Sequence, residues 1–517
     1  MSGRDDLSQL ARGAAAGPAA APVSVPDGPD LGLTPESFRA LGEQLLGALA
    51  DYKRALPTRT VRTLPPVELT RQIFSQPLPE SGAEPADLVG WMIDHLLPCS
   101  FGNDHPGFFA WITAPSAPIG ALADFMAATV NTPAGGPAPA AVNLEACVTR
   151  WLMELAGFPV DGSMGILVSG GSMANLTALA VARHWAAKAD GWNVRTEGLQ
   201  GGRARYTLYA TKEAHSCVRK SVELMGLGTD NLREVPTDGG RRLSVEGLAE
   251  AVAADRAAGL RPFCVVASAG TVNTGAVDPL AEIADFCERQ KLWLHVDGAY
   301  GWIGGIDPAK APLYKGLERA RSLALDPHKW LAVPIECGCT LVRDRELQRE
   351  TFSYLAPYLR IDGKAPDDVP YWPAEYGFQL TRGFRALKVW ATLSQLGRRG
   401  VRDLVVRHNA LARRLAAAVE ADPDLELMAP VTLSIVCFRY RPASWRGSDE
   451  DLDRLNQRIN DAVNEAGRFF FTPTSLDGRF SLRACIIHYA TGEAEVDGLL
   501  AAVRAAGARA RLDQGSV

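Results

Sequence analysis

Four polar side chains follow apolar runs of the sequence, at the points where those runs end. Lys329 lies in "SLALDPHKWL" (322–331), whose first residues predict a short buried strand, and Asp297 ends the run "LWLHVD". His215 follows "TLYAT", and Ser172 follows "MGILV" after two glycines. A lysine is rarely buried unless it is paired, and an apolar setting usually puts its amine to chemical use. These positions are therefore the first candidates for a functional site.

The Gly-Gly-Ser junction at 170–172 joins a predicted strand to a predicted helix in "VSGGSMANL". Free backbone amides and the dipole at a helix N-terminus bind anions, phosphate above all. An ordinary capped loop explains such a junction equally well. The segment matches neither the dinucleotide pattern G-x-G-x-x-G nor the GK[ST] of a phosphate loop. It also departs from the hydrolase pattern G-x-S-x-G, because Ala174 stands where the last glycine belongs.

Together the four features match the chemical groups of one cofactor. The junction offers a phosphate site, Asp297 a carboxylate for a ring nitrogen, His215 a flat group for a ring face and Lys329 an amine for an aldehyde. Pyridoxal phosphate (PLP) carries these four groups, and its aldehyde forms a Schiff base with lysine. Each side chain also has a purely structural explanation: a turn aspartate, a satisfied histidine and a solvated loop lysine.

Strands and helices alternate between about residues 100 and 345. Because the strand runs are apolar throughout, they predict an α/β domain whose mostly parallel sheet is covered on both faces. Ligands of such sheets bind beyond the carboxyl ends of the strands, where the four polar side chains lie. The predicted strands are 164–168, 207–211, 262–268, 292–297, 322–325 and 337–343.

The composition changes along the chain and predicts four parts. A helix is expected to begin after Thr34, which can cap it, and a second one carries Leu380 and Phe384 on its apolar face. A loop rich in Pro and Asp occupies about 356–377. The four parts are a disordered tail (1–32), an N-terminal helical segment (33–100), a large PLP-binding domain (101–395) and a small C-terminal α+β domain (396–517).

Bulk properties exclude several classes of function. The chain has 517 residues and a net charge of −5, so no basic excess favours nucleic acid or an anionic membrane surface. No apolar run approaches the roughly 20 residues that a membrane span needs. The nine cysteines show neither a metal-binding spacing nor a disulfide framework. Free thiols of this kind favour a reducing, cytoplasmic location.

Five motifs, "SGGSMANLTAL", "EAHSCVRK", "HVDGAYG", "DPHKW" and "RGFRALKVW", follow one another along the chain. In this order they resemble the PLP-dependent group II decarboxylases, and most of all the aromatic-L-amino-acid decarboxylases. The resemblance covers about residues 34–510. It implies an aspartate-aminotransferase-like large domain (PLP fold type I), an N-terminal helical extension and a small C-terminal domain. It also implies a homodimer whose active site lies at the interface.

The resemblance implies a role for each candidate residue. Lys329 would hold the cofactor aldehyde, Asp297 would pair with the pyridine nitrogen, and His215 would stack on the ring. Asp326 departs from the pattern, because animal relatives have asparagine there, in contact with the phosphate. An aspartate would repel a phosphate dianion, so either it points away or the phosphate is held differently. Further contacts to the cofactor are implied for Ser172, Met173, Thr271, Ala299 and His328.

The implied activity is the decarboxylation of an L-amino acid to the amine and carbon dioxide. The segment "HPGFFAWITAPSAP" resembles the family's substrate-pocket segment, and its Phe108, Trp111 and Ile112 favour an aromatic substrate. In the family, a loop tyrosine returns the proton to the substrate carbon. Tyr371 is predicted for that role here, with Tyr376 as the alternative.

Three other functions stay open. Relatives whose loop tyrosine is replaced by phenylalanine form aldehydes with oxygen, so an oxygen-consuming aldehyde synthase would release ammonia and peroxide. A carbon–carbon lyase on the same cofactor would release no carbon dioxide. A non-enzymatic homologue is disfavoured, because Lys329 and Asp297 are both present.

Overall fold

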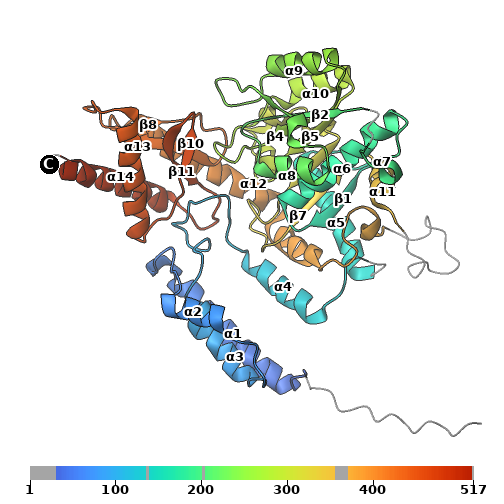
Figure 1. The fold of residues 1–517 in the computed structure, drawn as a ribbon. Coiled ribbons are helices and arrows are strands. Elements are labelled where there is room, and N and C mark those ends of the chain that lie inside the picture. The colour runs from blue at the N-terminus through green and yellow to red at the C-terminus, as the bar shows by residue number, and fades with distance from the viewer. Residues whose placement is uncertain (1–30, 136–138, 201–203, 355–370, 515–517) are drawn as a thin grey trace, which may run out of the picture.

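The computed structural model of the chain describes residues 31–135, 139–200, 204–354 and 371–514. Nearly all of the predicted tail and most of the predicted loop at 356–377 lie outside these ranges, so both predictions stay untested. Figure 1 shows a large part built of helices and strands, a smaller C-terminal part beside it, and a group of N-terminal helices that projects from both.

A seven-stranded sheet forms the centre of the large part, in the order β1-β7-β6-β5-β4-β2-β3. The pairs that join β3, β2, β4, β5 and β6 are parallel, whereas β7 pairs antiparallel with β1 and β6. The predicted, mostly parallel α/β sheet is confirmed. Its strands are β1 (Met164–Val168), β2 (Tyr206–Thr211), β3 (Leu232–Val235), β4 (Arg261–Ser268), β5 (Trp293–Asp297), β6 (Ser322–Leu325) and β7 (Gly338–Val342).

Helices cover both faces of this sheet, as two neighbouring residues of β2 show. Leu208 packs in an apolar cluster with α6 and α8, and the next residue, Tyr209, packs in a second cluster with α9 and α10. Successive strand residues point to opposite faces, so the two helix pairs lie on opposite sides. The helices of this part are α5 (Pro139–Ala156), α6 (Gly171–Ala189), α7 (Val194–Glu197), α8 (Ser216–Leu224), α9 (Val245–Ala257), α10 (Leu280–Gln290) and α11 (Arg345–Phe352).

The strands that carry the candidate residues end at the same edge of the sheet. β1 and β6 both pair antiparallel with β7, so they run in the same direction, which β4 and β5 share. Their last residues, Val168, Ser268, Asp297 and Leu325, therefore lie along one edge. The loops that follow these strands are brought together there.

The C-terminal part is a four-stranded antiparallel sheet in the order β10-β11-β9-β8, on which the last two described helices and the C-terminal half of the helix before β8 pack. The long helix α12 (Arg385–Glu420) leads into it. Gly397 interrupts α12 with a positive φ of 60°, close to the predicted domain boundary at 395/396, which stays a prediction. The remaining elements are β8 (Leu425–Leu427), β9 (Ile435–Tyr440), α13 (Asp449–Glu465), β10 (Thr474–Leu476), β11 (Arg479–Cys485) and α14 (Glu493–Gln514).

The beginning of α12 corrects one sequence-based expectation. The helix begins at Arg385, with Phe384 as its N-cap residue, so Leu380 and Phe384 do not lie on a helical face. Arg382 precedes the helix because its guanidinium is held in the interior by Glu145, at 2.6 Å. This tertiary ion pair, which periodicity cannot reveal, anchors the segment before the helix.

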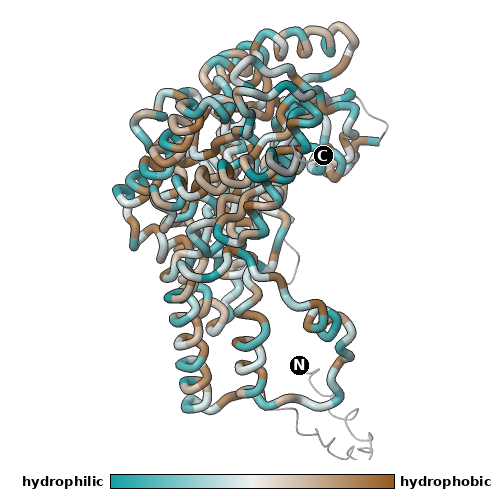
Figure 2. Tube along the Cα trace, turned by 90° about the vertical axis from the view of Figure 1, so that its left-hand side faces the viewer, coloured by the Kyte–Doolittle hydropathy of each residue, from teal (hydrophilic) through white to brown (hydrophobic). Residues whose placement is uncertain are grey.

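The N-terminal helices α1 (Pro35–Ala55), α2 (Val67–Ser75) and α3 (Pro85–Trp91) project from the rest of the chain (Figures 1 and 2). As predicted, Thr34 caps α1, because its Oγ1 accepts a hydrogen bond from Ser37 N at 3.1 Å. The apolar face of α1 is largely uncovered: Phe38 is 45% exposed, and only Tyr52 is buried.

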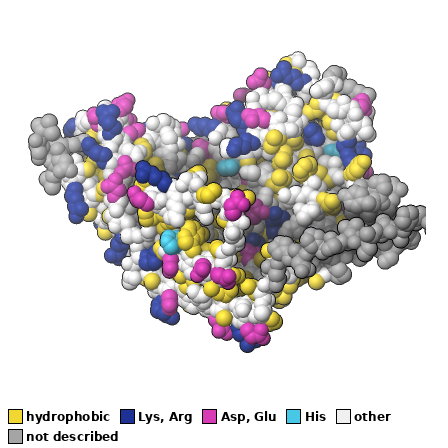
Figure 3. Space-filling view, turned by 60° about the horizontal axis from the view of Figure 1, so that its bottom comes forward, with side chains coloured by type: hydrophobic (Ala, Val, Ile, Leu, Met, Phe, Trp, Pro, Cys, Tyr) yellow, Lys and Arg dark blue, Asp and Glu magenta, His cyan; other side chains and the backbone are white. Residues whose placement is uncertain are grey.

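Exposed apolar side chains continue from α1 onto α4 (Pro118–Val130), where Phe125 stacks on Phe38 with ring centroids 6.1 Å apart. Figure 3, seen from the side on which these helices project, shows hydrophobic side chains gathered on the surface. The exposed apolar side chains of these helices include Phe38, Leu46 and Leu49 on α1, Leu88 on α3, and Leu122, Phe125, Met126 and Val130 on α4. Among the helices in the described ranges, none has the length and hydrophobicity needed to cross a bilayer.

Candidate active site

A cavity of about 660 Å³ lies at the edge of the sheet where the strands end. The segment 111–113 and residues 472–474 of the C-terminal part complete its wall. The residues predicted from the sequence line this cavity, apart from Phe108, Tyr371 and its alternative Tyr376. They are Trp111, Ile112, Ser172, Met173, His215, Thr271, Asp297, Ala299, Asp326, His328 and Lys329.

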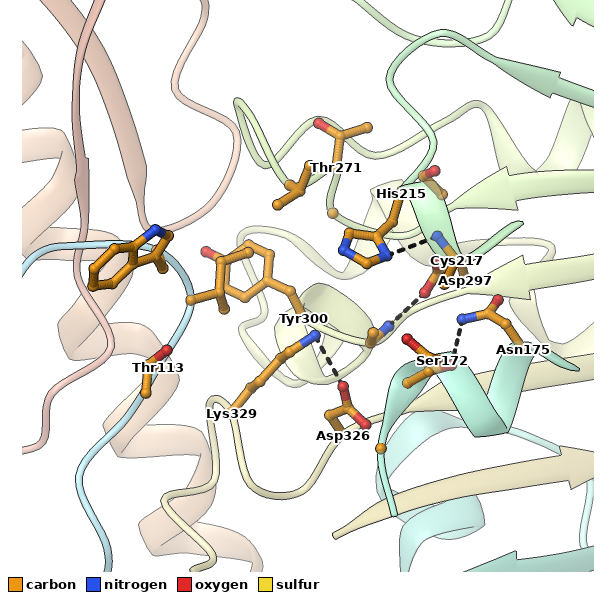
Figure 4. A pocket seen from close by; sticks show the side chains of 18 of the residues that line it. Thr113, Ser172, Asn175, His215, Cys217, Thr271, Asp297, Tyr300, Asp326 and Lys329 are labelled. Atoms are coloured by element: carbon orange, nitrogen blue, oxygen red, sulfur yellow. Dashed lines mark hydrogen bonds and ion pairs between the residues drawn. The ribbon is translucent and has the colours of Figure 1, made fainter. Parts of the chain in front are cut away.

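Lys329 lies in a tight turn after β6, where an Asp-Pro pair favours turn formation and Lys329 N donates to the Asp326 carbonyl at 3.1 Å. Its Nζ is 2.9 Å from Asp326 Oδ2 (Figure 4). Burial disfavours the ammonium form, but the carboxylates of Asp326 and Asp297 outweigh it and raise the pKa of Lys329. The lysine is therefore an ammonium ion held by a carboxylate.

Asp297 is the last residue of β5, and its side chain is at the cavity wall. Its Oδ1 accepts a hydrogen bond from Ala299 N at 3.1 Å, as a turn aspartate does, and this contact fixes the carboxylate. The glycine at 298 is required by close packing, because a Cβ there would lie 2.8 Å from the Cβ of Trp302. Asp297 therefore stabilises the turn after β5 and also lines the cavity.

His215 caps α8, because its Nδ1 accepts a hydrogen bond from Cys217 N at 3.2 Å. Burial lowers the pKa of His215, although the carboxylate of Asp297 acts in the opposite direction. The imidazole is therefore neutral near pH 7, with its proton on Nε2. Figure 4 shows the ring between Thr271 and Asp297, at the cavity.

The N-terminus of α6 lies at the cavity wall. The first hydrogen bond within the helix runs from Ala174 N to the Gly170 carbonyl, at 2.9 Å. The amides of Gly171, Ser172 and Met173 precede it, so they point out of the helix end and are suited to an anion. Asn175 Nδ2 donates to the Gly171 carbonyl at 2.8 Å and steadies this turn (Figure 4).

Thr271 and His328 reach the cavity from two loops. Thr271 Oγ1 accepts a hydrogen bond from Ala276 N at 3.1 Å and so is fixed by its own turn. His328 Nδ1 lies 2.7 Å from the Cys337 carbonyl oxygen. Burial lowers the pKa of His328, although Asp326 opposes the shift.

Phe108 does not line the cavity of its own chain, so its place in the substrate pocket stays a prediction. It is buried, and its ring packs against Phe101 and Phe470, each at 5.8 Å between centroids. Trp111, three residues later, is the aromatic side chain of this segment that reaches the cavity. Phe108 supports it from behind, with ring centroids 6.1 Å apart.

Tyr371 also lies away from the cavity of its own chain. Its hydroxyl donates to the Gly165 carbonyl at 2.9 Å and lies 3.4 Å from Glu145 Oε1. Burial and the Glu145 carboxylate raise the pKa of this phenol well above its usual value. Tyr376 is buried beside it, where its hydroxyl accepts from Arg345 Nε at 3.0 Å. The described part of the loop therefore brings neither tyrosine to the cavity.

One group of cavity residues was not predicted from the sequence. Arg483 on β11 donates to the carbonyls of Val272 at 2.7 Å and of Trp111 and Asn273 at 3.0 Å each. Asn273 in turn donates to Glu213 Oε2 at 3.0 Å. The contacts of Arg483 join segments more than 200 residues apart, so no local motif could reveal them. They fix the wall of the cavity that the C-terminal part supplies.

The cavity fits PLP in its donors and in its room. It offers an amine, a carboxylate and a row of helix amides, which suit an aldehyde, a ring nitrogen and a phosphate. Glycines keep it open: a Cβ at Gly171 would lie 2.7 Å from Asp326 Oδ2 and 3.0 Å from Ala299 Cβ. In the described residues, no cluster of His, Cys, Asp and Glu side chains could hold a metal ion.

Comparison with known proteins decides the family. The model described as the pyridoxal-dependent decarboxylase conserved domain matches residues 68–441. The chain belongs to the pyridoxal-dependent decarboxylases. An aromatic-L-amino-acid decarboxylase of Bacillus atrophaeus is 32% identical to this decarboxylase over 478 residues, which are 92% of this chain and 96% of the relative. A phenylacetaldehyde synthase of Arabidopsis thaliana is 27% identical and covers 87% of this chain and 92% of the relative.

A solved structure shows the same fold. Oryza sativa TDC with PLP and tryptamine matches this decarboxylase with a TM-score of 0.86 and 26% identity, covering 92% of this chain and 99% of that one. The predictions of family, PLP cofactor, fold type I and PLP-dependent amino-acid decarboxylase are thereby confirmed.

Proposed function

We propose that this decarboxylase converts an aromatic L-amino acid to its amine and carbon dioxide. The observation that carries the proposal is Trp111, which lines the cavity and is 40% exposed. Its backbone has a positive φ of 45°, which non-glycine residues adopt only where the surroundings hold them. Arg483 holds its carbonyl, and Thr472 Oγ1 accepts from its amide at 3.1 Å. An indole fixed in this way presents a flat apolar surface to a substrate ring.

The residues around the cavity would divide the chemistry among them. Bound PLP supplies an electron sink for the bond that breaks at the substrate carbon. Lys329 would hold the cofactor aldehyde, and the carboxylate of Asp297 would keep a proton on the ring nitrogen. His215, neutral and fixed by Cys217 N, would pack on one face of the ring, with Ala299 on the other. The remaining cofactor contacts would come from Ser172, Met173, Thr271, Asp326 and His328.

A second product remains open, because the relatives include an aldehyde synthase. The sequence proposal that Tyr371 returns the proton gains no support from its position beside Gly165. Tyr300 lines the cavity, but its ring stacks on Trp330 at 4.9 Å and its hydroxyl contacts Ser434 Oγ. Within the described ranges, no tyrosine at the cavity has a free hydroxyl to protonate the substrate carbon. His328 lines the cavity, and we propose that it donates this proton from the minor, protonated form of its imidazole.

We also propose that the enzyme is a homodimer. The apolar side chains on α1, α3 and α4 lack cover within the chain, and a second copy would bury them. Phe125→Asp on α4 should lower the apparent mass in sedimentation at micromolar protein, whereas an unchanged mass would contradict this surface. All nine cysteines are free, which supports the proposal of a reducing, cytoplasmic compartment.

The experiment that tests the function is a substrate screen with the purified enzyme and added PLP. Each L-amino acid is assayed for carbon dioxide, amine, aldehyde and hydrogen peroxide. Carbon dioxide and amine from tryptophan, tyrosine or phenylalanine are the expected result. Activity confined to acidic or aliphatic amino acids would contradict the aromatic assignment, and stoichiometric aldehyde and peroxide would establish the alternative product.

A further inference from the structure

Asp326 occupies the cavity where the resemblance implied a neutral contact to phosphate. We propose that Asp326 is an internal anion that pairs with Lys329 at the N-terminus of α6 and opposes the cofactor phosphate, so that it weakens PLP binding by this enzyme. The proposal rests on the assignment of Lys329 and α6 to the cofactor under Proposed function.

The contacts of Asp326 show that its carboxylate is not turned away. Its side chain is 1% exposed, and Oδ2 lies 2.9 Å from Lys329 Nζ and 3.9 Å from His328 Nε2. Oδ1 is buried and has no hydrogen-bond partner among the described residues. A buried carboxylate oxygen without a donor is costly, and structural roles do not explain it.

The carboxylate lies directly against the end of α6. A Cβ added at Gly171, the first residue of the helix, would meet Oδ2 at 2.7 Å, and one at Gly338 would meet Oδ1 at 2.8 Å. The helix dipole stabilises a negative charge at this position. The carboxylate of Asp326 is therefore stabilised by the same helix dipole, and lies beside the same backbone amides, that would bind a phosphate.

The other charges around the cavity do not offset this one. Among the described lining residues, the carboxylates are Glu213, Asp297, Asp326 and Glu336, and the cations are Lys329 and Arg483. Arg483 is 4% exposed and donates to three backbone carbonyls. Burial lowers the pKa values of His215 and His328, so both rings are neutral near pH 7. Lys329 is thus the one cation available to balance Asp326.

Attachment of the cofactor uses the amine of Lys329, which is that same cation. When the ammonium of Lys329 condenses with an aldehyde, a C=N bond forms, one water leaves and the nitrogen keeps one proton. The nitrogen then has a single N–H in place of three, so its ion pair with Asp326 weakens. A phosphate at the end of α6 adds further negative charge within a few ångströms of the same carboxylate. Asp326 therefore disfavours PLP binding in two ways, through its weakened ion pair with Lys329 and through its repulsion of the phosphate.

The test is equilibrium binding of PLP to the protein stripped of cofactor, followed by the visible absorbance of the lysine-bound form. Asp326→Asn should lower the Kd for PLP by at least about tenfold, which is about 1.4 kcal/mol. Pyridoxal lacks the phosphate and keeps only the opposition through Lys329, so its Kd should also fall, but by less than about threefold. Equal tightening for both ligands would mean that only Lys329 is affected, and an unchanged or higher Kd for PLP would also overturn the proposal.

Two further variants separate charge from hydrogen bonding and from general effects. Asp326→Ala removes the charge without adding a donor, so it should also bind PLP more tightly than the wild type. Tightening in Asp326→Asn alone would assign the effect to the new amide and overturn the proposal. Asp307→Asn changes a buried carboxylate that does not line the cavity, and its Kd should equal that of the wild type. An equal gain in that control would also contradict a local effect.

The same titration keeps the two proposals apart. If PLP gives no visible band even in the wild type, the assignment of Lys329 is wrong, and the role of Asp326 falls with it. If the wild type gives the band and the Kd does not respond to Asp326, the proposed function stands and only the internal anion is refuted. Thermal unfolding without cofactor shows whether each variant is folded.

Discussion

Tyr371 is the residue for which the sequence and the structure suggest different roles, and Tyr371→Phe separates them. The structure shows a core hydrogen bond from its hydroxyl to the Gly165 carbonyl, at 2.9 Å. The phenol also packs beside the buried pair of Glu145 and Arg382, whose side chains are 0% and 1% exposed. Phenylalanine keeps the ring but removes the donor. Because one buried hydrogen bond is lost, we expect the free energy of unfolding to fall by about 1–2 kcal/mol.

The assay for Tyr371→Phe is urea unfolding, followed by tryptophan fluorescence, together with the amine-to-aldehyde ratio in turnover. The control is Tyr354→Phe, whose ring is 82% exposed and whose change should stay within about 0.5 kcal/mol. We expect the product ratio of Tyr371→Phe to equal that of the wild type. Unchanged stability together with a shift from amine to aldehyde would refute the core role and support the proton-donor role predicted from the sequence.

Three further predictions concern the cofactor and the pH dependence of stability. Lys329→Ala should abolish the visible absorbance band of the enzyme with PLP; a band that persists contradicts the assignment of Lys329. Asp297→Asn should leave the circular dichroism spectrum intact and lower turnover by more than about 10²-fold, or about 2.7 kcal/mol; a loss below about threefold would make Asp297 only a turn residue. Burial lowers the pKa of three histidines to about 4 or below, so the unfolded chain takes up protons that the folded chain excludes. Their contribution to stability is fully present above pH 6.5 and is lost as pH falls toward about 4, at about 1.4 kcal/mol per pH unit for each. Urea midpoints at about pH 7.5 and about pH 5.5 check this, and equal midpoints would contradict it. The histidines are His295 and His488, with pKa values of about 4, and His408, with a pKa of about 3.

The residues that the sequence located well lie at the ends of buried strands. β6 spans 322–325 as predicted, and β5 ends at Asp297 as predicted. A fully buried parallel strand needs a continuous apolar run, so its end is visible as the first polar residue. Since function in such sheets is placed beyond these ends, the same local pattern that predicts the strand also indicates Asp297 and Lys329.

The substrate side of the cavity is formed by contacts between segments far apart in the sequence, so local sequence patterns could not predict it. Phe108 and Trp111 are both aromatic and three residues apart, so the sequence alone treats them alike. In the structure Phe108 forms an isolated parallel bridge with Phe470, which draws its ring into the interior. Trp111 is turned to the cavity by its positive φ and by Arg483 from β11. Contacts from the C-terminal part therefore determine which of the two aromatic rings reaches the cavity.

Asp326 shows how a conflict within the sequence can indicate function before the structure explains it. An aspartate beside an expected phosphate left two possibilities: a carboxylate that points away, or a phosphate that is held differently. The ion pair with Lys329 and the contact with the end of α6 exclude the first. A residue that breaks the local rule and still lies at the centre of the site is expected where function, rather than stability, sets the choice. The cost of that carboxylate would fall on cofactor binding, which is where the effect of removing it should be measured.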